Sequence, residues 1–279
     1  MIGAKEIQIG LNHVYQADSL RDFWWQVSWR APQIEKGTTL IADYSLMSTP
    51  EDYVIWGPAN LIYFPEIQET VPIKIQLPAS ILVEENVMNI LGSGVGYPRD
   101  RRGNYVREDF TAVLVMTQPT SDSCVRILDG SMPELSPLDR YEVMLTAPYS
   151  LIGNVNMAAT SQPLPEDIFG PEPVHGWCYY YQKFALASQM GDWASAITLG
   201  EEATSKGFRP FDPVEWTPLL RAYVATRQVG ALGPYSGIMN MTPFIRNQTC
   251  QILKQTANET APDDLELLTF INDNYCRLP

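Results

Sequence analysis

The sequence predicts an α+β protein, with a mixed α/β N-terminal domain at residues 1–160 and an all-α domain at 175–279. Three observations support this fold class. Short β-branched runs separated by Pro, Gly and Asn fill most of the first half, as in strands joined by turns. Residues 161–174 are rich in proline and lack periodicity, which indicates a linker. Beyond it, apolar residues recur at the spacing of helices.

The N-terminal domain begins with a predicted amphipathic helix at residues 10–30, where most apolar side chains share one face and "RAP" ends the helix. A short helix is predicted near residues 50–64, because Pro50, Glu51 and Asp52 suit a helix start. Six runs predict strands: TTLIADYS, PIKIQL, SILVEE, TAVLVMTQ, SCVRILD and YEVMLTA.

The C-terminal domain begins with two predicted helices joined at Gly191 and Asp192. The first carries an aromatic face and the second carries small residues, which allow close helix packing. The aromatic face consists of Trp177, Tyr180, Tyr181 and Phe184, and the facing positions are Ala196, Gly200 and Ala203. Further helices are predicted around residues 216–224, 243–256 and 263–276.

The segment from Tyr180 to Ala203 resembles one tetratricopeptide unit, with an aromatic first helix, a Gly-Asp-Trp turn and alanines seven residues apart in the second helix. The following stretch keeps a first helix, but its second helix is interrupted by Gly and Pro between residues 230 and 237. The sequence therefore predicts one clear unit with degenerate neighbours and excludes a long repeat array.

Several longer stretches carry a second resemblance: "RDFWWQVSWRAPQIEKGTTLIAD", "SCVRILDG", "IFGPEPVHGWCYYYQKFALASQMGDW" and "EWTPLLRAYV". They resemble the C-terminal extracytoplasmic region of multi-spanning bacterial, Chloroflexi-like membrane proteins related to C-type glycosyltransferases. The resemblance covers most of the chain. It implies an extracytoplasmic domain attached to a membrane-spanning part, with that part or another protein as partner. A cytoplasmic protein is the alternative.

On that resemblance, Trp24, Trp25 and Trp29 would lie near the lipid interface, where amphipathic aromatic side chains are favoured. The alternative is that the three tryptophans belong to the hydrophobic core. The sequence leaves both interpretations open.

Composition excludes some classes of partner. The formal net charge of −13 repels phosphate backbones, so we expect no nucleic-acid partner. No run reaches the roughly 18 to 20 apolar residues that span a bilayer. The four cysteines and two histidines show no metal-type spacing, so we expect no metal site and no cofactor. One or two disulfides are possible in an oxidising compartment, and pairing within the C-terminal three cysteines and free buried thiols stay open as alternatives. These are Cys124, Cys178, Cys250 and Cys276.

An arginine-rich segment, "RDRRGNYVR", is the best local candidate for binding an anionic sugar, lipid head or acidic partner, because guanidinium groups suit carboxylates and phosphates. It contains Arg99, Arg101, Arg102 and Arg107. A solvated loop is the alternative.

His175 and Cys178 could meet on one helix turn, but no orienting carboxylate accompanies them, so we assign no catalytic residue. "NQT" at residue 247 matches only a glycosylation sequon.

Three functions follow from these observations. The first is a non-catalytic extracytoplasmic binding or scaffolding domain of a membrane-embedded glycosyltransferase-like protein. The second is an independent tetratricopeptide-like module that binds a peptide or a partner protein, for which an exposed hydrophobic groove on the helices would be evidence. The third is a carbohydrate-active enzyme, which requires two carboxylates roughly 5 to 10 Å apart in a cleft.

Overall fold

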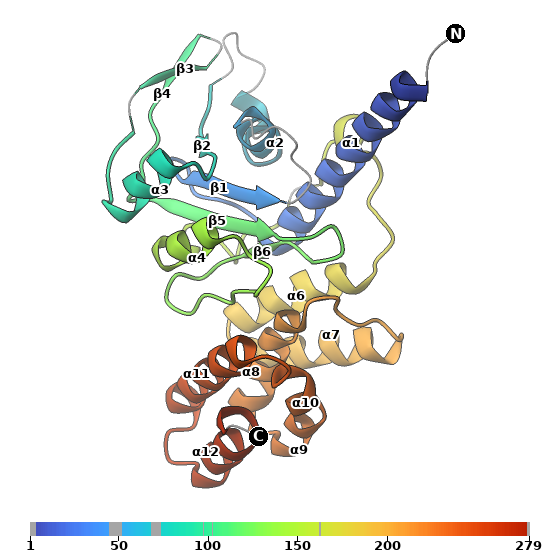
Figure 1. Cartoon of the computed structure of the whole chain (residues 1–279), viewed down its shortest axis with the longest axis vertical. Coiled ribbons are helices and arrows are strands. Elements are labelled where there is room, and N and C mark those ends of the chain that lie inside the picture. Colours follow the sequence, from blue (N-terminus) through green and yellow to red (C-terminus); the bar gives the residue numbers. More distant parts are fainter. Residues whose placement is uncertain are drawn as a thin grey trace. The chain divides into compact units, whose positions relative to one another are not determined.

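A computed structural model describes residues 4–44, 52–67, 74–96, 98–101, 103–161 and 163–277 (Figure 1). They form an α+β fold, with a mixed four-stranded sheet and its helices followed by a mainly helical region. The chain divides into two compact units. Unit 1 comprises Met1–Ser121, Val125–Gly130 and Arg140–Val174, and unit 2 comprises Asp122–Cys124, Ser131–Asp139 and His175–Pro279.

The unit boundary at residue 175 lies where the helical domain is predicted to begin, but two short earlier segments also belong to unit 2. The stretch 161–174, predicted as a linker, belongs to unit 1 and contains a short helix, α5 (Glu166–Phe169). Proline-rich sequence therefore packs here as part of a compact unit.

The sheet of unit 1 has the strand order β2-β1-β5-β6. These strands are β1 (Thr39–Tyr44), β2 (Ala79–Ser80), β5 (Val113–Gln118) and β6 (Arg126–Ile127). Leu40 of the central strand β1 pairs with Ala79 on one side and with Leu114 on the other, both in parallel register. All six residues of β5 are buried, as expected for a strand covered on both faces.

Helices surround this sheet: α1 (Ala4–Arg30), α2 (Tyr53–Tyr63), α3 (Glu84–Leu91) and α4 (Tyr141–Thr146), with 3-10 turns at Pro65–Ile67, Ala147–Tyr149 and Ile152–Asn154. The buried amide of Asn60 on α2 pairs with the main chain of Leu77. Its Nδ2 donates to the Leu77 carbonyl at 2.9 Å, and the Leu77 N–H donates to its Oδ1 at 3.0 Å.

Three predicted strands are wrong over most of their described length. "SILVEE" leads into α3, because Glu84 and Glu85 stabilise a helix N-terminus and Val87 and Ile90 bury one helical face. "YEVMLTA" forms α4, whose buried Val143 and Thr146 follow helical spacing. Of "PIKIQL", residues 74–77 are described and form no strand, and its start lies outside the described residues together with the rest of 68–73.

The arginine-rich segment, in contrast, forms two short antiparallel strands, β3 (Arg99–Arg101) and β4 (Asn104–Val106), in place of a loop. The Asp100 carboxylate accepts the Gly103 N–H at 2.7 Å, which stabilises the turn between them.

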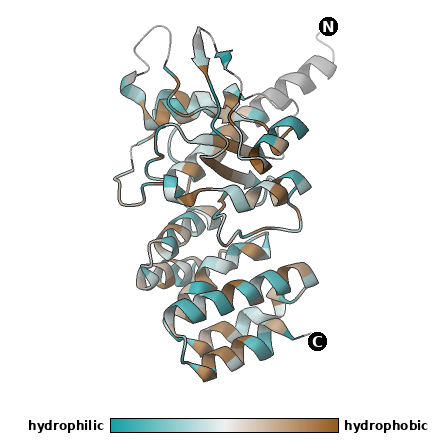
Figure 2. Ribbon diagram, turned by 90° about the vertical axis from the view of Figure 1, so that its left-hand side faces the viewer, coloured by the Kyte–Doolittle hydropathy of each residue, from teal (hydrophilic) through white to brown (hydrophobic). Residues whose placement is uncertain are grey.

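Unit 2 is mainly helical. Its elements are α6 (Trp177–Gln189), α7 (Trp193–Ser205), η4 (Pro213–Trp216), α8 (Thr217–Ala225), α9 (Val229–Leu232), η5 (Gly233–Tyr235), α10 (Ser236–Met239), α11 (Pro243–Thr260), α12 (Leu265–Ile271) and a π-helical turn η6 (Asn272–Cys276). Figure 2 shows that the longer helices of unit 2 each carry both hydrophilic and hydrophobic residues, as amphipathic helices do. Short helices replace a full second helix between residues 229 and 239, where glycine and proline interrupt the pattern.

The predicted hairpin of two helices is confirmed. Trp177, Tyr180, Tyr181 and Phe184 of α6 are all buried, together with Ala196, Gly200 and Ala203 of α7. Gly191 adopts φ +73° at the turn, and the Asp192 carboxylate accepts the Ser195 N–H at 3.1 Å to cap α7. The aromatic face therefore forms the interior of the hairpin.

Two disulfides lie within unit 2, Cys124–Cys178 and Cys250–Cys276. The second joins α11 to the π-helical turn at the end of α12. In the part of the chain that the structure describes, no helix is both long and apolar enough to cross a membrane.

Gly200 offers a test of the helix packing. A Cβ at this position would lie 2.6 Å from Leu219 Cδ1, and Leu219 is fully buried on α8. We expect Gly200→Val to lower the free energy of unfolding by about 1–3 kcal/mol through overpacking, measured by urea denaturation. Ala194→Val on the exposed face of the same helix is the control, with an expected change below about 0.7 kcal/mol. Equal losses in both variants would contradict close packing at Gly200.

Candidate functional site

The candidate site lies on α11. Thr242 caps this helix by accepting the Ile245 N–H on its hydroxyl at 3.2 Å. One face of α11 is buried in unit 2, whereas Asn247, Gln251 and Gln255 are exposed. These three amides are four residues apart in succession, so they form a row along one side of the helix.

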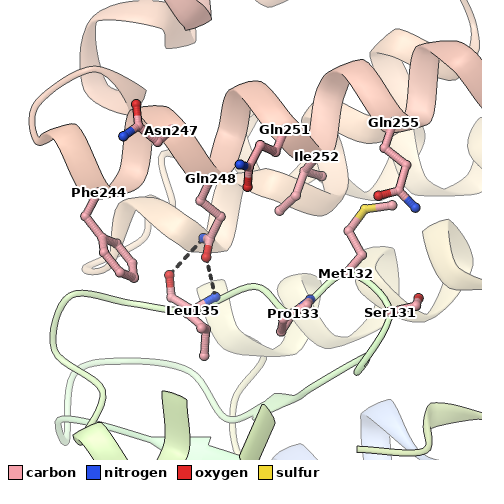
Figure 3. A pocket seen from close by; sticks show the side chains of 10 residues that line it. All are labelled: Ser131, Met132, Pro133, Leu135, Phe244, Asn247, Gln248, Gln251, Ile252 and Gln255. Atoms are coloured by element: carbon pink, nitrogen blue, oxygen red, sulfur yellow. Dashed lines mark hydrogen bonds between the residues drawn. The ribbon is translucent and has the colours of Figure 1, made fainter. Parts of the chain in front are cut away.

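A segment from a distant part of the sequence, 131–135, lies against α11 within unit 2. Gln248 Nε2 donates to the Leu135 carbonyl at 2.8 Å, and the Leu135 N–H donates to Gln248 Oε1 at 3.0 Å (Figure 3). One side-chain amide therefore binds both main-chain groups of a single residue. In Figure 3 Met132 extends from this segment toward Ile252 and Gln255 of the helix.

Between the segment and the helix lies an open pocket of about 380 Å³, which we call the α11 pocket. Its volume falls within the range of small-ligand sites. Its lining consists of Ser131, Met132, Pro133, Leu135, Phe244, Asn247, Gln248, Gln251, Ile252 and Gln255.

The chemistry of the α11 pocket is neutral. None of its lining residues carries an ionisable carboxylate, imidazole, thiol, amine or guanidinium. Proton transfer and the activation of a nucleophile such as the Ser131 hydroxyl rely on such groups, and this lining contains none of them. Amides and one hydroxyl supply hydrogen bonds, while Met132, Ile252 and Phe244 supply apolar surface.

A second pocket of unit 2, of about 540 Å³, is lined by Thr204, Arg209, Pro210, Trp216, Pro234, Tyr235 and Ile238. The rings of Trp216 and Tyr235 lie 4.7 Å apart. Burial raises the pKa of Tyr235, so this phenol stays protonated at neutral pH. Arg209 Nη1 donates to the carbonyls of Thr204 at 3.1 Å and Phe208 at 2.6 Å, which orients it along the pocket wall.

Glu215 is a buried carboxylate with a structural role. It accepts the Cys124 N–H at 2.8 Å and the Trp177 indole N–H at 2.6 Å. Cys178 forms a disulfide with Cys124, so it has no thiol for nucleophilic attack. His175 stacks on Tyr179, with ring centroids 3.5 Å apart. The sequence pair His175 and Cys178 therefore does not form a catalytic dyad.

The predicted anion site is only partly described. Arg99 lies 4.0 Å from the buried carboxylate of Glu108, and Arg107 is exposed beyond β4. Arg101 ends β3, and Arg102 lies outside the described residues. Because Arg99 faces a carboxylate of its own chain, its charge is partly neutralised. Anion binding by this segment stays a prediction.

Trp24, Trp25 and Trp29 are buried in unit 1, as in the core interpretation of the sequence. The Trp25 indole N–H donates to the Phe169 carbonyl at 3.1 Å, and the Trp29 indole N–H donates to Glu172 at 2.9 Å. These contacts leave little indole surface for lipid. Membrane attachment of the chain by other means stays a prediction.

The chain was compared with protein-family models, with curated proteins and with solved structures, and none of them matches it. Within the described residues, no group of three or more His, Cys, Asp or Glu side chains is arranged to hold a metal ion.

Sequence reasoning missed the α11 pocket. The signal was present in "NQTCQILKQ", where amide side chains recur at helical spacing, but "NQT" was interpreted only as a sequon. The other wall, residues 131–135, is more than a hundred positions away in the sequence, and Gln248 and Leu135 are 113 residues apart. No periodicity in the sequence connects the two walls.

The pairing of Gln248 with Leu135 can be tested directly. We expect Gln248→Ala to lower the free energy of unfolding by about 1–3 kcal/mol, because two hydrogen bonds are lost. Hydrogen exchange of the Leu135 amide should also become faster. Gln251→Ala, on the exposed face of the same helix, is the control and should change stability by less than about 0.5 kcal/mol. Unchanged Leu135 exchange in Gln248→Ala would contradict the pairing.

Proposed function

We propose that this chain is a non-catalytic, extracytoplasmic binding domain and that the α11 pocket is its ligand site. The neutral lining of an open pocket is the observation that carries the proposal. A pocket formed by amides and apolar side chains can orient a ligand by hydrogen bonds and bury part of its surface, but it has no group that moves a proton.

The alternative of a carbohydrate-active enzyme finds no support in either pocket. Such an enzyme needs two carboxylates on opposite sides of the scissile bond. The α11 pocket is lined by no carboxylate, and the pocket at Trp216 and Tyr235 is lined by one arginine and no carboxylate.

The two disulfides support the proposed extracytoplasmic location. Cys124–Cys178 and Cys250–Cys276 suggest an oxidising, extracytoplasmic environment, because thiols in the bacterial cytosol are kept reduced. This setting agrees with the resemblance to extracytoplasmic regions of glycosyltransferase-like membrane proteins. We therefore propose that the domain serves the membrane-spanning part of such a protein, as a binding or scaffolding element.

An independent tetratricopeptide-like interaction module is the second candidate, because the α11 pocket is a partly apolar depression on the helices. Part of the surface of α8 and α11 is already engaged by a segment of the same chain. Arg221 of α8 lies 3.9 Å from Glu134, and Gln248 of α11 binds Leu135. The two candidates share a binding site and differ in cellular setting.

Cellular setting can be tested by thiol trapping in the native cells. We expect all four cysteines to resist alkylation before reduction and to react after it. We also expect removal of either disulfide by paired Cys→Ser substitution to cost about 2–5 kcal/mol of folding stability. The same samples should place the protein in the membrane pellet, at a mass above the 31.4 kDa of this chain. Free thiols on a cytoplasmic protein would contradict the extracytoplasmic proposal.

Binding at the α11 pocket can be tested by NMR with neutral probes. N-acetyl-leucine methylamide, maltotriose and N-acetylglucosamine are added separately at millimolar concentration to the ¹⁵N-labelled chain. We expect at least one of them to shift the side-chain amide signals of Gln251 and Gln255. Gln251→Trp should abolish the shift by filling the pocket.

Asn258→Trp is the matched control, because Asn258 is exposed on the same helix and does not line the pocket. If no neutral probe shifts a pocket signal, or if both variants lose the shift equally, the pocket is not the ligand site.

A further inference from the structure

We infer that the α11 pocket binds an extended, uncharged stretch of polypeptide, which pairs its main chain with the Gln251 amide and places one apolar side chain in the space lined by Met132, Ile252 and Phe244. This inference rests on the proposed binding function and names its class of ligand.

Hydrogen-bond geometry is the first support. Gln248 binds the N–H and the carbonyl of Leu135 together, so α11 already holds the main chain of one residue through a side-chain amide. Asn60 of α2 binds the N–H and the carbonyl of Leu77 in the same way. Both Gln248 and Asn60 therefore pair a side-chain amide with the main chain of one residue as an internal contact of this protein.

Spacing is the second support. Gln251 and Gln255 are four residues apart, so they lie about 6 Å apart along the helix axis. An extended chain presents main-chain groups to the same side every second residue, which is about 6.6 Å. Adjacent amides of α11 can therefore meet alternate residues of one extended peptide.

The amide of Gln251 is available for this role. The Gln251 side chain is exposed and makes no hydrogen bond within the described part of the chain. Gln255 donates to Glu259 at 3.0 Å through Nε2, which leaves its oxygen as an acceptor for a ligand N–H.

The apolar surface and the lack of charge in the pocket determine which kind of ligand side chain it can accept. Met132 and Ile252 line the pocket but are only 7% and 3% exposed, so Phe244, at 38% exposure and at one end, offers more free apolar surface than either of them. A charged side chain placed there would lose hydration without an ionic partner in the lining. An apolar side chain such as leucine would gain buried area.

A glycan is the competing ligand. Sugar rings are commonly held by stacking on aromatic side chains, and Phe244 is the only aromatic residue that lines the α11 pocket. The pairing of Gln248 with Leu135 gives a direct model for main-chain recognition and none for a sugar. The observations therefore favour a peptide.

The experiment compares the capped tripeptide acetyl-Ala-Leu-Ala-methylamide with three other probes. These are the same peptide with the leucine nitrogen methylated, the same peptide with glutamate in place of leucine, and maltotriose. Binding is followed by the side-chain amide signals of the pocket. We expect the unmodified peptide to bind, and the methylated and glutamate peptides to bind about tenfold more weakly.

The variant Gln251→Ala makes the test specific, with Asn258→Ala as the matched exposed control. We expect Gln251→Ala to weaken the unmodified peptide about tenfold and to remove the effect of methylation, because the amide that pairs with the main chain is gone. Asn258→Ala should behave as the wild-type chain. Far-UV circular dichroism checks that both variants fold.

The outcomes distinguish the failure of the peptide inference from the failure of the proposed binding function. Binding of maltotriose without binding of the peptide would overturn the peptide inference and leave the binding function standing. Equal binding of methylated and unmodified peptides would overturn main-chain pairing. If no probe binds, the binding function and the peptide inference both fail.

Discussion

The organisation of unit 2 depends on the buried carboxylate of Glu215. Taking a carboxylate out of water costs several kcal/mol unless hydrogen-bond donors replace the water. Here the Cys124 N–H and the Trp177 indole N–H are among those donors, and the disulfide Cys124–Cys178 joins the same two places covalently. The carboxylate and the crosslink together fix the short segment 122–124 against the first turn of α6 and against η4, the turn that precedes α8.

Segment 131–139 also belongs to unit 2, and it too is held by side chains of helices. Glu134 approaches Arg221 of α8, and Leu135 is bound by Gln248 of α11. The segment itself has no regular secondary structure, so its position comes from side chains of helices that lie much later in the sequence. The α11 pocket exists because a non-helical segment and an amphipathic helix meet without filling the space between them.

Helical periodicity made the C-terminal unit predictable, because long amphipathic patterns are unambiguous. The same approach failed for "SILVEE" and "YEVMLTA", where short apolar runs fit a strand and a helix equally well. In α3 the acidic pair Glu84 and Glu85 favours the helix, and in α4 the burial of Val143 and Thr146 does so. Tertiary packing determines whether these segments form strands or helices, and a single sequence does not reveal that packing.

The candidate site was harder to predict than the fold, because sequence searches for function look for charged, nucleophilic or metal-binding residues. The α11 pocket has none, and its amides gain meaning only when Leu135 is seen to be bound by one of them. A neutral site also suits a chain with a net charge of −13. Such a charge repels anionic ligands at long range but leaves the approach of an uncharged peptide unaffected. The net charge therefore disfavours anionic ligands but attracts cationic ones, so it is the neutral lining of the pocket that favours an uncharged ligand.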